Sequence, residues 1–296
     1  STSTASSVPT GGSRRGWGRS MASPATQWVD AAPQLSEREL SAIIDLVYQK
    51  SGITLHSGKR ELVTARLQKR VKQGGFASFS QYLNHVQADT SGDELTALLD
   101  AIATNHTHFF REAQHFDFLV DRVVPEILAK AGGAGLTGWC AACSTGEEPY
   151  TILMRMLEAG HDRVRLLASD MSTKALATAR AGVYRMDKVS DVPAPLLRTY
   201  FEKGMGEQAG LARVSARLRT LVEYQALNLL EITSLGRRFD FIFCRNVMIY
   251  FDKPVQQRVV TMLERHLAPG GYLFIAHSES LNGIQHGLQS VIPAVF

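Results

Sequence analysis

The sequence predicts an α/β fold in which helices cover a parallel sheet, preceded by a small helical domain. Three observations predict it. Short apolar runs alternate with amphipathic helices over the second half of the chain, a pattern typical of a parallel sheet with helices on its faces. Residues 34–131 carry helical periodicity. Trp139–Tyr150 reads as a buried strand, a turn of small residues and a helix start, the kind of turn at which open α/β sheets bind ligands.

Length and composition limit the class of protein. The 296 residues suffice for two domains. The formal net charge of +4 suits an acidic partner but does not by itself indicate nucleic-acid binding. The three cysteines are too few for a disulfide framework, which favours a reducing compartment. No apolar run approaches the roughly 18 residues of a membrane span, so we expect no membrane insertion.

The first part of the chain divides into a tail and a helical domain. Residues 1–33 are rich in Ser, Thr, Gly, Ala and Pro and predict a disordered tail. Residues 34–131 predict a helical domain and a linker helix, and Pro125 is expected to break or restart that linker helix. The helices are expected to begin at the Ser36–Glu39 capping box, near Gly58, after Ser78, near Asp93 and near Phe116.

The second predicted helix, from about Gly58 to Gln73, is strongly basic, with Glu61 as its one acid. A charge run is usually a solvated face. Because bases far outnumber acids in this helix, a face that docks a partner and a solvated face are equal alternatives. Helical spacing places three of the bases on one side of the helix: Lys59, Arg66 and Arg70.

Residues 132–296 predict the α/β domain. Its strands are expected at 136–142, 164–168, 221–226, 239–244 and 272–276, and its helices at 147–159, 172–181 and 254–266. Residues 186–223 interrupt the alternation and predict an inserted β-unit, whose strands would be 211–214 and 218–224.

Acidic residues follow the first two strands of this domain. Glu147 and Glu148 stand at a helix N-terminus, which usually attracts phosphate. Two carboxylates there would repel a pyrophosphate, so the pair indicates a cationic ligand. Asp170 ends the second strand, where an acid commonly binds ribose hydroxyls, although it could also be an ordinary acid at a helix start.

Cysteines and histidines do not predict a metal or redox site. Cys140 and Cys143 have the spacing of a redox pair, but the neighbouring acids would raise a thiol pKa, so buried cysteines are favoured. With Cys244 they remain short of the four ligands of a zinc site. His106 and His108 lack a third ligand. We therefore expect no metal.

Several motifs together resemble the chemotaxis receptor methyltransferase family, commonly called CheR. The resemblance runs from about Leu35 to the C-terminus and implies a Rossmann-like, S-adenosylmethionine-dependent methyltransferase domain after an all-helical domain, with residues 186–223 as an antiparallel β-subdomain. Such enzymes methylate glutamate side chains of chemoreceptors for sensory adaptation and release S-adenosylhomocysteine. The motifs are Thr104–Glu112, Cys143–Tyr150, Ala168–Asp170, Asn228–Leu230, Phe239–Lys253, Pro269–Tyr272 and His277–Ser280.

The resemblance also implies roles for the matched residues. Arg111 and Tyr250 would face the reacting centre, and Arg111, beside two phenylalanines, suits the capture of a carboxylate. Either Glu147 or Glu148 would hold the methionine portion of the cofactor, and Asp170 would hold its ribose. The rest of the cofactor site would comprise Asn105, Thr107, Arg111, Asn228, Leu229, Arg245 and Asn246.

The partners implied are receptors. The basic face of Lys59, Arg66 and Arg70 would dock the cytoplasmic helical domain of a chemoreceptor. The β-subdomain, which in some members of the family grips a short peptide at the receptor C-terminus, is a second candidate contact. The resemblance implies a cytoplasmic enzyme recruited to membrane receptor arrays, with no nucleic-acid partner. One departure is Ala142, where many relatives have glycine.

The chemistry of the implied reaction suits these residues. A glutamate, with a pKa of about 4.3, is ionised at pH 7 and needs no general base. A nucleic-acid amino-methyltransferase is disfavoured because Val247-Met248 follows Asn246 in place of the Pro-Pro-aromatic turn of such enzymes. A nicotinamide enzyme would need a G-x-G-x-x-G motif, which is absent. A module that senses S-adenosylmethionine without turnover is the remaining rival, and measurable turnover would separate the two.

Overall fold

The computed structural model describes residues 33–55, 57–103, 106–131 and 135–296, so the predicted tail lies outside it except for Pro33. The first part is all helical, as predicted. Its helices share one apolar core that includes Ile43, Leu67, Phe79 and Leu98. They are α1 (Glu37–Ser51), α2 (Arg60–Gln73), α3 (Phe79–Ala88) and α4 (Asp93–Ile102).

The start of α1 has the predicted capping box. The Ser36 hydroxyl accepts the N–H of Glu39 at 3.3 Å, and the Glu39 carboxylate accepts the N–H of Ser36 at 2.9 Å. These bonds satisfy N–H groups that have no partner inside the helix. Gly52 ends the helix with a φ of 71°, a left-handed conformation that glycine adopts without steric cost.

The linker helix is interrupted before Pro125, as expected. It consists of α5 (Gln114–Phe118), a π turn at Leu119–Val123 and α6 (Val124–Ala131). Proline has no N–H to donate to the preceding turn. The wider π turn accommodates that missing bond without separating the two helices.

The α/β domain contains a five-stranded parallel sheet in the order β6-β2-β1-β7-β8. The order reverses direction between β1 and β7, and ligands bind at such a switch point, beyond the carboxyl ends of the strands. The strands are β1 (Leu136–Ala141), β2 (Val164–Asp170), β6 (Val222–Ala226), β7 (Phe239–Cys244) and β8 (Leu267–Phe274).

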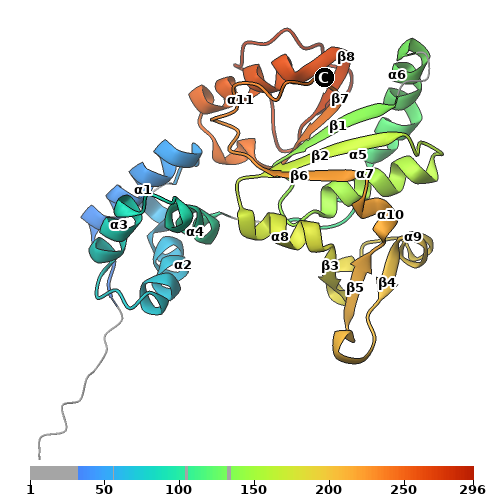
Figure 1. Cartoon of the computed structure of the whole chain (residues 1–296). Coiled ribbons are helices and arrows are strands. Elements are labelled where there is room, and N and C mark those ends of the chain that lie inside the picture. Colours follow the sequence, from blue (N-terminus) through green and yellow to red (C-terminus); the bar gives the residue numbers. More distant parts are fainter. Residues whose placement is uncertain (1–32, 56, 104–105, 132–134) are drawn as a thin grey trace, which may run out of the picture. The chain divides into compact units, whose positions relative to one another are not determined.

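Helices cover both faces of this sheet (Figure 1). On one face Cys140 and Phe243 pack with α5, α6, α7 (Glu147–Glu158) and α8 (Thr173–Ala181). On the other face Trp139 and Ile242 pack with α11 (Lys253–His266). Both faces are buried, which explains why the strands read as nearly continuous apolar runs. None of the described helices is long and apolar enough to cross a bilayer.

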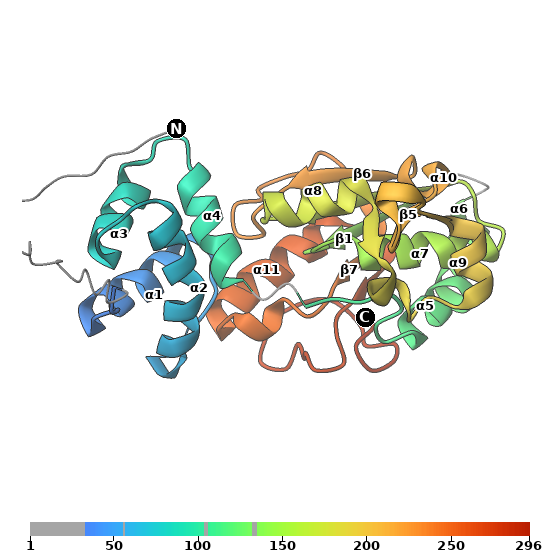
Figure 2. The same ribbon diagram turned by 90° about the horizontal axis from the view of Figure 1, so that it is seen from below.

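A three-stranded antiparallel sheet of order β3-β5-β4 lies on the side of α7 and α8 (Figure 2). Its strands are β3 (Val183–Arg185), β4 (Phe201–Lys203) and β5 (Leu211–Val214), with α9 (Ala194–Tyr200) before β4. The expected strand at 211–214 is confirmed, but the one at 218–224 is wrong. Residues Ala216–Arg219 form the short helix α10, and the chain then enters β6, which pairs with β2 of the main sheet.

The last strand starts earlier than expected, at Leu267 rather than Tyr272. Gly270 has a φ of 75°, and the register against β7 shifts across this bend. The sequence pattern therefore reveals only the part of β8 that follows the bend.

The turn between β1 and α7 is built from left-handed residues. Gly146 has a φ of 97°, and a Cβ there would lie 2.8 Å from the Cβ of Ala179, so only glycine fits. Ala142 and Ser144 have φ values of 63° and 50°. Residues other than glycine bear a steric cost in this left-handed backbone conformation. A glycine at position 142 would avoid this cost.

We predict that Ala142→Gly stabilises the protein by about 0.5–1 kcal/mol, because it relieves the left-handed strain at φ 63°. The measurement is the free energy of unfolding in urea. The matched control is Ala141→Gly in the extended strand β1, which should destabilise by about 1 kcal/mol. A destabilised Ala142→Gly would show that the alanine methyl contributes more than its backbone strain costs.

Candidate active site

A cleft of the described residues lies at the carboxyl ends of β1, β2, β6 and β7, and residues of the helical domain complete it. Its open volume, counting solvent at its mouth, is about 1330 Å³. Asn105 lies outside the described residues, and Glu147 is absent from the walls. The other residues predicted for the reaction and the cofactor line it: Thr107, Arg111, Glu148, Asp170, Asn228, Leu229, Arg245, Asn246 and Tyr250.

Only one of the two acids at the start of α7 faces the cleft. Glu147 is buried, and its carboxylate accepts the hydroxyl of Thr145 at 2.6 Å. Burial raises the pKa of Glu147. Glu148 lines the cleft. Of these two acids, between which the resemblance did not decide, the structure places only Glu148 on the cleft wall, because successive residues of a helix point about 100° apart.

A buried arginine compensates Glu148. The side chain of Arg245 has no solvent exposure, and it lies 2.8 Å from the Glu148 carboxylate and 3.0 Å from the Glu112 carboxylate. It also donates to the backbone oxygen of Arg111 at 2.6 Å and packs over the ring of Phe116. One guanidinium between two carboxylates leaves this cluster one negative charge in excess.

The thiol of Cys140 belongs to the same cluster. It donates to the second oxygen of Glu148 at 3.0 Å. Burial raises the pKa of the Cys140 and Cys143 thiols well above the ordinary value. Both cysteines therefore remain neutral thiols, in line with the expectation of buried rather than redox-active cysteines.

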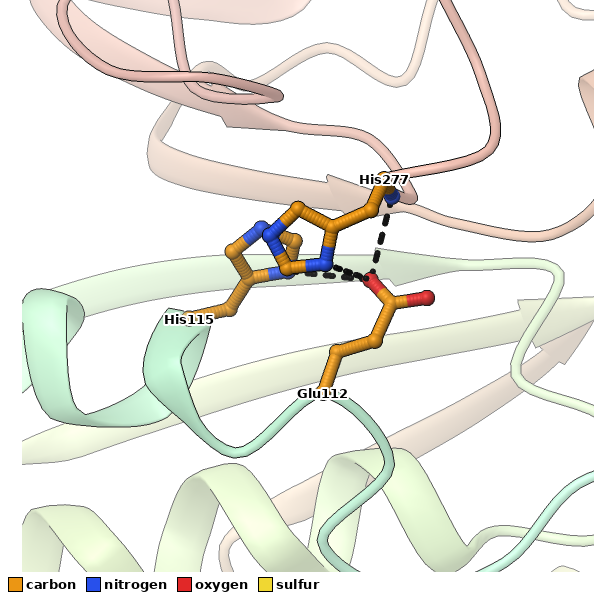
Figure 3. Close-up of side chains that lie close together, drawn as sticks. All are labelled: Glu112, His115 and His277. Carbon is orange, nitrogen blue, oxygen red and sulfur yellow. Dashed lines mark hydrogen bonds and ion pairs between the residues drawn. The ribbon is translucent and has the colours of Figure 1, made fainter.

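Glu112 joins Arg245 to two histidines (Figure 3). Its Oε2 lies 3.1 Å from Nδ1 of His277 and 3.6 Å from Nδ1 of His115, and it accepts the backbone N–H of His277 at 3.2 Å. Burial raises the pKa of Glu112, but Arg245 and the His277 N–H outweigh it, and the net shift is downward. Glu112, His115 and His277 are residue types that ligate metals. In this structure the cation beside Oε2 of Glu112 is the guanidinium of Arg245.

Sequence reasoning missed the roles of Glu112, His115, His277 and Glu279. Three of them stand in motifs that the resemblance singled out, but motifs do not tell which side chains meet. His115 lies outside those motifs, and it is buried with its ring stacked on that of His277. Both ring nitrogens of His115 are buried without a hydrogen-bond partner among the described residues. Burial, with Arg245 and His277 nearby, lowers the pKa of His115 to about 4.

Asp170 and Asn228 are two further polar residues of the cleft wall. The Asp170 carboxylate accepts the N–H groups of Ser144 and Ser172, each at 2.8 Å, and burial raises its pKa. The Asn228 amide donates to the backbone oxygen of Lys50, the penultimate residue of α1, at 2.7 Å. Asn228 thus connects the end of β6 to the helical domain. Both side chains line the cleft.

Asn246 and Tyr250 lie on the loop after β7. Asn246 has a φ of 59°, which asparagine tolerates better than most residues. The backbone oxygen of Tyr250 accepts the N–H of Thr54 at 2.8 Å. The loop that carries the predicted reacting residue is therefore attached to the segment after α1.

The predicted docking face on α2 needs correction. Arg66 donates to the backbone oxygens of Ile102 and Ala103. Arg70 pairs with Glu94 at 2.5 Å and contacts the hydroxyl of Tyr82. Both arginines are half-buried because they bind groups of neighbouring helices inside the domain.

Other bases of this helix remain accessible. Lys59 is exposed and lines the cleft. Lys69 and Lys72 are exposed on the outer face of α2. The basic surface therefore consists of Lys59, which belongs to the predicted set, together with Lys69 and Lys72.

Two family models match the chain over most of its length. The CheR methyltransferase all-alpha domain matches residues 38–103, and the CheR methyltransferase SAM binding domain matches residues 105–294. The chain belongs to the CheR methyltransferase family. S-adenosylmethionine is accordingly its cofactor, and the methyltransferase fold and all-helical domain predicted from the resemblance are confirmed.

Curated relatives in this family are chemotaxis protein methyltransferases. The protein from Borreliella burgdorferi is 36% identical over 88% of this chain and 94% of its own length. Those of Klebsiella aerogenes and Escherichia coli are 40% and 39% identical, over 84% and 85% of this chain and 86% and 87% of their own lengths. These relatives place the CheR chain described here among chemotaxis methyltransferases.

The polar groups of the cleft fit S-adenosylmethionine. Its amino group and ribose diol donate hydrogen bonds and its sulfonium is a cation, and the walls offer the carboxylates of Glu148 and Asp170. The hydroxyl oxygens of Ser144 and Thr54 are buried without a partner among the described residues, although both residues line the cleft. Buried polar atoms are nearly always hydrogen-bonded in native proteins. The unpartnered hydroxyls therefore point to a polar ligand in this cleft.

We predict that His115 makes the fold sensitive to acid. Folded His115 stays neutral down to about pH 4, whereas in the unfolded chain it takes up a proton below about pH 6.5. The stability that neutral His115 contributes is fully present well above pH 6.5 and is lost as the pH falls, by about 1.5 kcal/mol between pH 6.5 and 5. His115→Gln should lack this loss, measured by urea unfolding at the two pH values.

The control is His85→Gln, which removes an exposed histidine of α3 and should keep the wild-type pH dependence. Equal losses of stability in wild type and His115→Gln would contradict the assignment of the low pKa to the folded state.

Proposed function

We propose that this protein transfers the methyl group of S-adenosylmethionine to glutamate side chains of chemoreceptors, producing methyl esters for sensory adaptation. The observation that carries the proposal is the state of Arg111 in the cleft. Within the described part of the chain, its guanidinium donates to the backbone oxygen of His106 at 3.0 Å and pairs with no carboxylate. The remaining N–H groups are available for a substrate carboxylate.

The cofactor would be held by residues from both domains. Glu148 would accept its amino group, and Asp170, with two of its lone pairs already bound to backbone N–H groups, would accept the ribose hydroxyls. The other walls would be Thr107, Asn228, Leu229, Arg245 and Asn246, which line the same cleft. Asn105 keeps the role that the resemblance implies, although it lies outside the described residues.

When bound, S-adenosylmethionine supplies an electrophilic methyl group on a positively charged sulfur. Arg111 would hold one oxygen of the substrate glutamate so that the other oxygen faces this methyl group. Tyr250, which lines the same cleft, would orient the same carboxylate through its hydroxyl. The protein has no proton to remove, because the glutamate is already ionised at neutral pH.

Alignment is therefore the main task of these side chains. Holding two reactants in line can contribute roughly 7–11 kcal/mol to lowering the barrier. Neutralisation of the carboxylate by the sulfonium also proceeds better in a cleft from which water is excluded. An arginine bond that is equally strong before and during transfer would not raise the rate, so Arg111 must bind with the geometry of the transition state.

The receptor would approach from the side of the helical domain. Lys59 lines the cleft, and Lys69 and Lys72 extend the basic surface along α2. These charges suit the acidic cytoplasmic helices of a receptor, and they would bring the enzyme to membrane receptor arrays. The small sheet of β3, β5 and β4 has edge strands that could pair with an extended receptor C-terminal peptide.

The test is transfer of radiolabelled methyl groups from S-adenosylmethionine to receptor-containing membranes. We expect label on receptors that is released as methanol by base, as for a carboxylate ester. Absence of label with folded enzyme and a matched receptor would contradict the proposal. Binding of the cofactor with no turnover on any receptor would favour the sensing module.

Arg111→Ala is the informative variant in this assay. It should lower turnover roughly a hundredfold while cofactor affinity, measured by calorimetry, stays within about threefold of wild type. The matched control is Arg122→Ala, which removes an exposed arginine of the π turn that pairs with Glu126. A loss of affinity larger than the loss of turnover would assign Arg111 to cofactor binding.

A further inference from the structure

The carboxylate of Glu279 lies behind the loop Asn246–Tyr250 and is bound by its backbone. One oxygen accepts the N–H of Met248 at 2.8 Å and of Ile249 at 3.3 Å. The other accepts the N–H of Asn246 at 3.1 Å and of Ala276 at 2.8 Å. A single side chain thus satisfies three amides of this loop and one amide at the end of β8.

The loop is shaped to hold an anion. Asn246 has a φ of 59° and Val247 a φ of −118°, and this change of hand turns successive N–H groups toward one point, as in the anion-binding nests of backbone. The largest contributions to the environment of Glu279 are its burial and the backbone N–H groups of Ala276, Asn246, Met248 and Ile249. The four backbone dipoles therefore compensate its charge, and burial raises its pKa.

The same loop delivers side chains to the cleft. Asn246, Val247 and Tyr250 line it, whereas Glu279 does not. Met248 is buried in the core beside α11, which anchors the middle of the loop. The position of Tyr250 relative to Arg111 therefore depends on how this backbone is held.

We propose that Glu279 is a positioning residue for methyl transfer, which acts by fixing the Asn246–Tyr250 loop through its backbone amides. This inference takes from the proposed function only the identity of the reaction, which is methyl transfer. The Glu279 side chain does not line the cleft and meets the backbone of the loop that does. Its effect on turnover passes through the loop.

The substitution Glu279→Gln tests this with little change in volume. A glutamine offers one oxygen and one NH₂ group. The NH₂ would take the place of a carboxylate oxygen that now accepts two backbone N–H bonds, and it would meet those N–H donors with a donor of its own. Two of the four bonds are lost, and the loop loses its fixed geometry. Misplacement by about 1 Å can cost a hundredfold in rate.

The direct readout is hydrogen exchange at the amides of Asn246, Met248 and Ile249 in the full chain. In wild type these amides should be protected, and in Glu279→Gln they should exchange at least tenfold faster. Turnover on receptors should fall ten- to a hundredfold, while cofactor affinity stays within about threefold, because Glu148 and Asp170 remain in place. The thermal midpoint checks that the variant is folded.

The matched control is Glu264→Gln on α11. Glu264 also accepts one backbone N–H, that of Gly287 at 2.9 Å, but it lies away from the cleft. It should leave loop exchange, turnover and affinity unchanged.

The exchange experiment overturns the proposal if the loop amides stay protected in Glu279→Gln, or if their exchange accelerates with turnover unchanged. A second comparison separates positioning from general destabilisation. In a Tyr250→Phe background, Glu279→Gln should lower turnover less than it does alone, because both act through one side chain. Fully additive losses would assign Glu279 to stability and contradict its role.

If wild type itself methylates no receptor, the proposed function fails, and the exchange measurement still decides whether Glu279 holds the loop.

Discussion

The buried guanidinium of Arg245 is the interaction on which the rest of the site depends. Its side chain has no contact with solvent, and its charge is met by Glu148 from the start of α7 and by Glu112 from the segment before α5. Removing one partner of a buried ion pair typically costs about 3–5 kcal/mol, because it leaves a charge uncompensated. The arginine therefore fixes three separate chain segments relative to one another.

This arrangement divides the cleft into two electrostatic regions. Near Arg245 the two carboxylates exceed the one guanidinium, which suits the positively charged methyl donor. Arg111 stands beside that region, and its backbone oxygen is held by Arg245 at 2.6 Å. The residue that would receive the substrate carboxylate is thus placed by the residue that orients Glu148, so cofactor and substrate groups share one support.

Patterns that act over a few residues could be predicted from the sequence. The capping box of Ser36, the strand Phe239–Cys244 and the helix that begins at Glu147 follow from local periodicity and punctuation. The carboxyl ends of parallel strands meet at one edge of a sheet, so the order of strands along the chain was enough to place Asp170 and Arg245 at one site, to which the family resemblance added Asn228. The family resemblance supplied their expected roles.

Contacts between distant segments could not be predicted in this way. Local spacing placed Arg66 and Arg70 on one face of a helix, but their partners Ile102 and Glu94 belong to another helix. His277 is 165 residues from Glu112, whose carboxylate accepts its N–H. The orientation of Glu147 and Glu148 was likewise undetermined, because adjacent residues in the sequence carry the same charge and differ only in the direction they face.

The most direct test compares Glu148→Gln with Glu147→Gln in calorimetric binding of S-adenosylhomocysteine. The two variants make the same chemical change at adjacent positions, and circular dichroism confirms that each is folded. If Glu148 is the acid of this adjacent pair that faces the cofactor, Glu148→Gln should weaken binding roughly ten- to a hundredfold, as expected for a lost bond to a charged group. Glu147→Gln should stay within about threefold of wild type. Equal affinities, or a larger loss in Glu147→Gln, would contradict this account of the site.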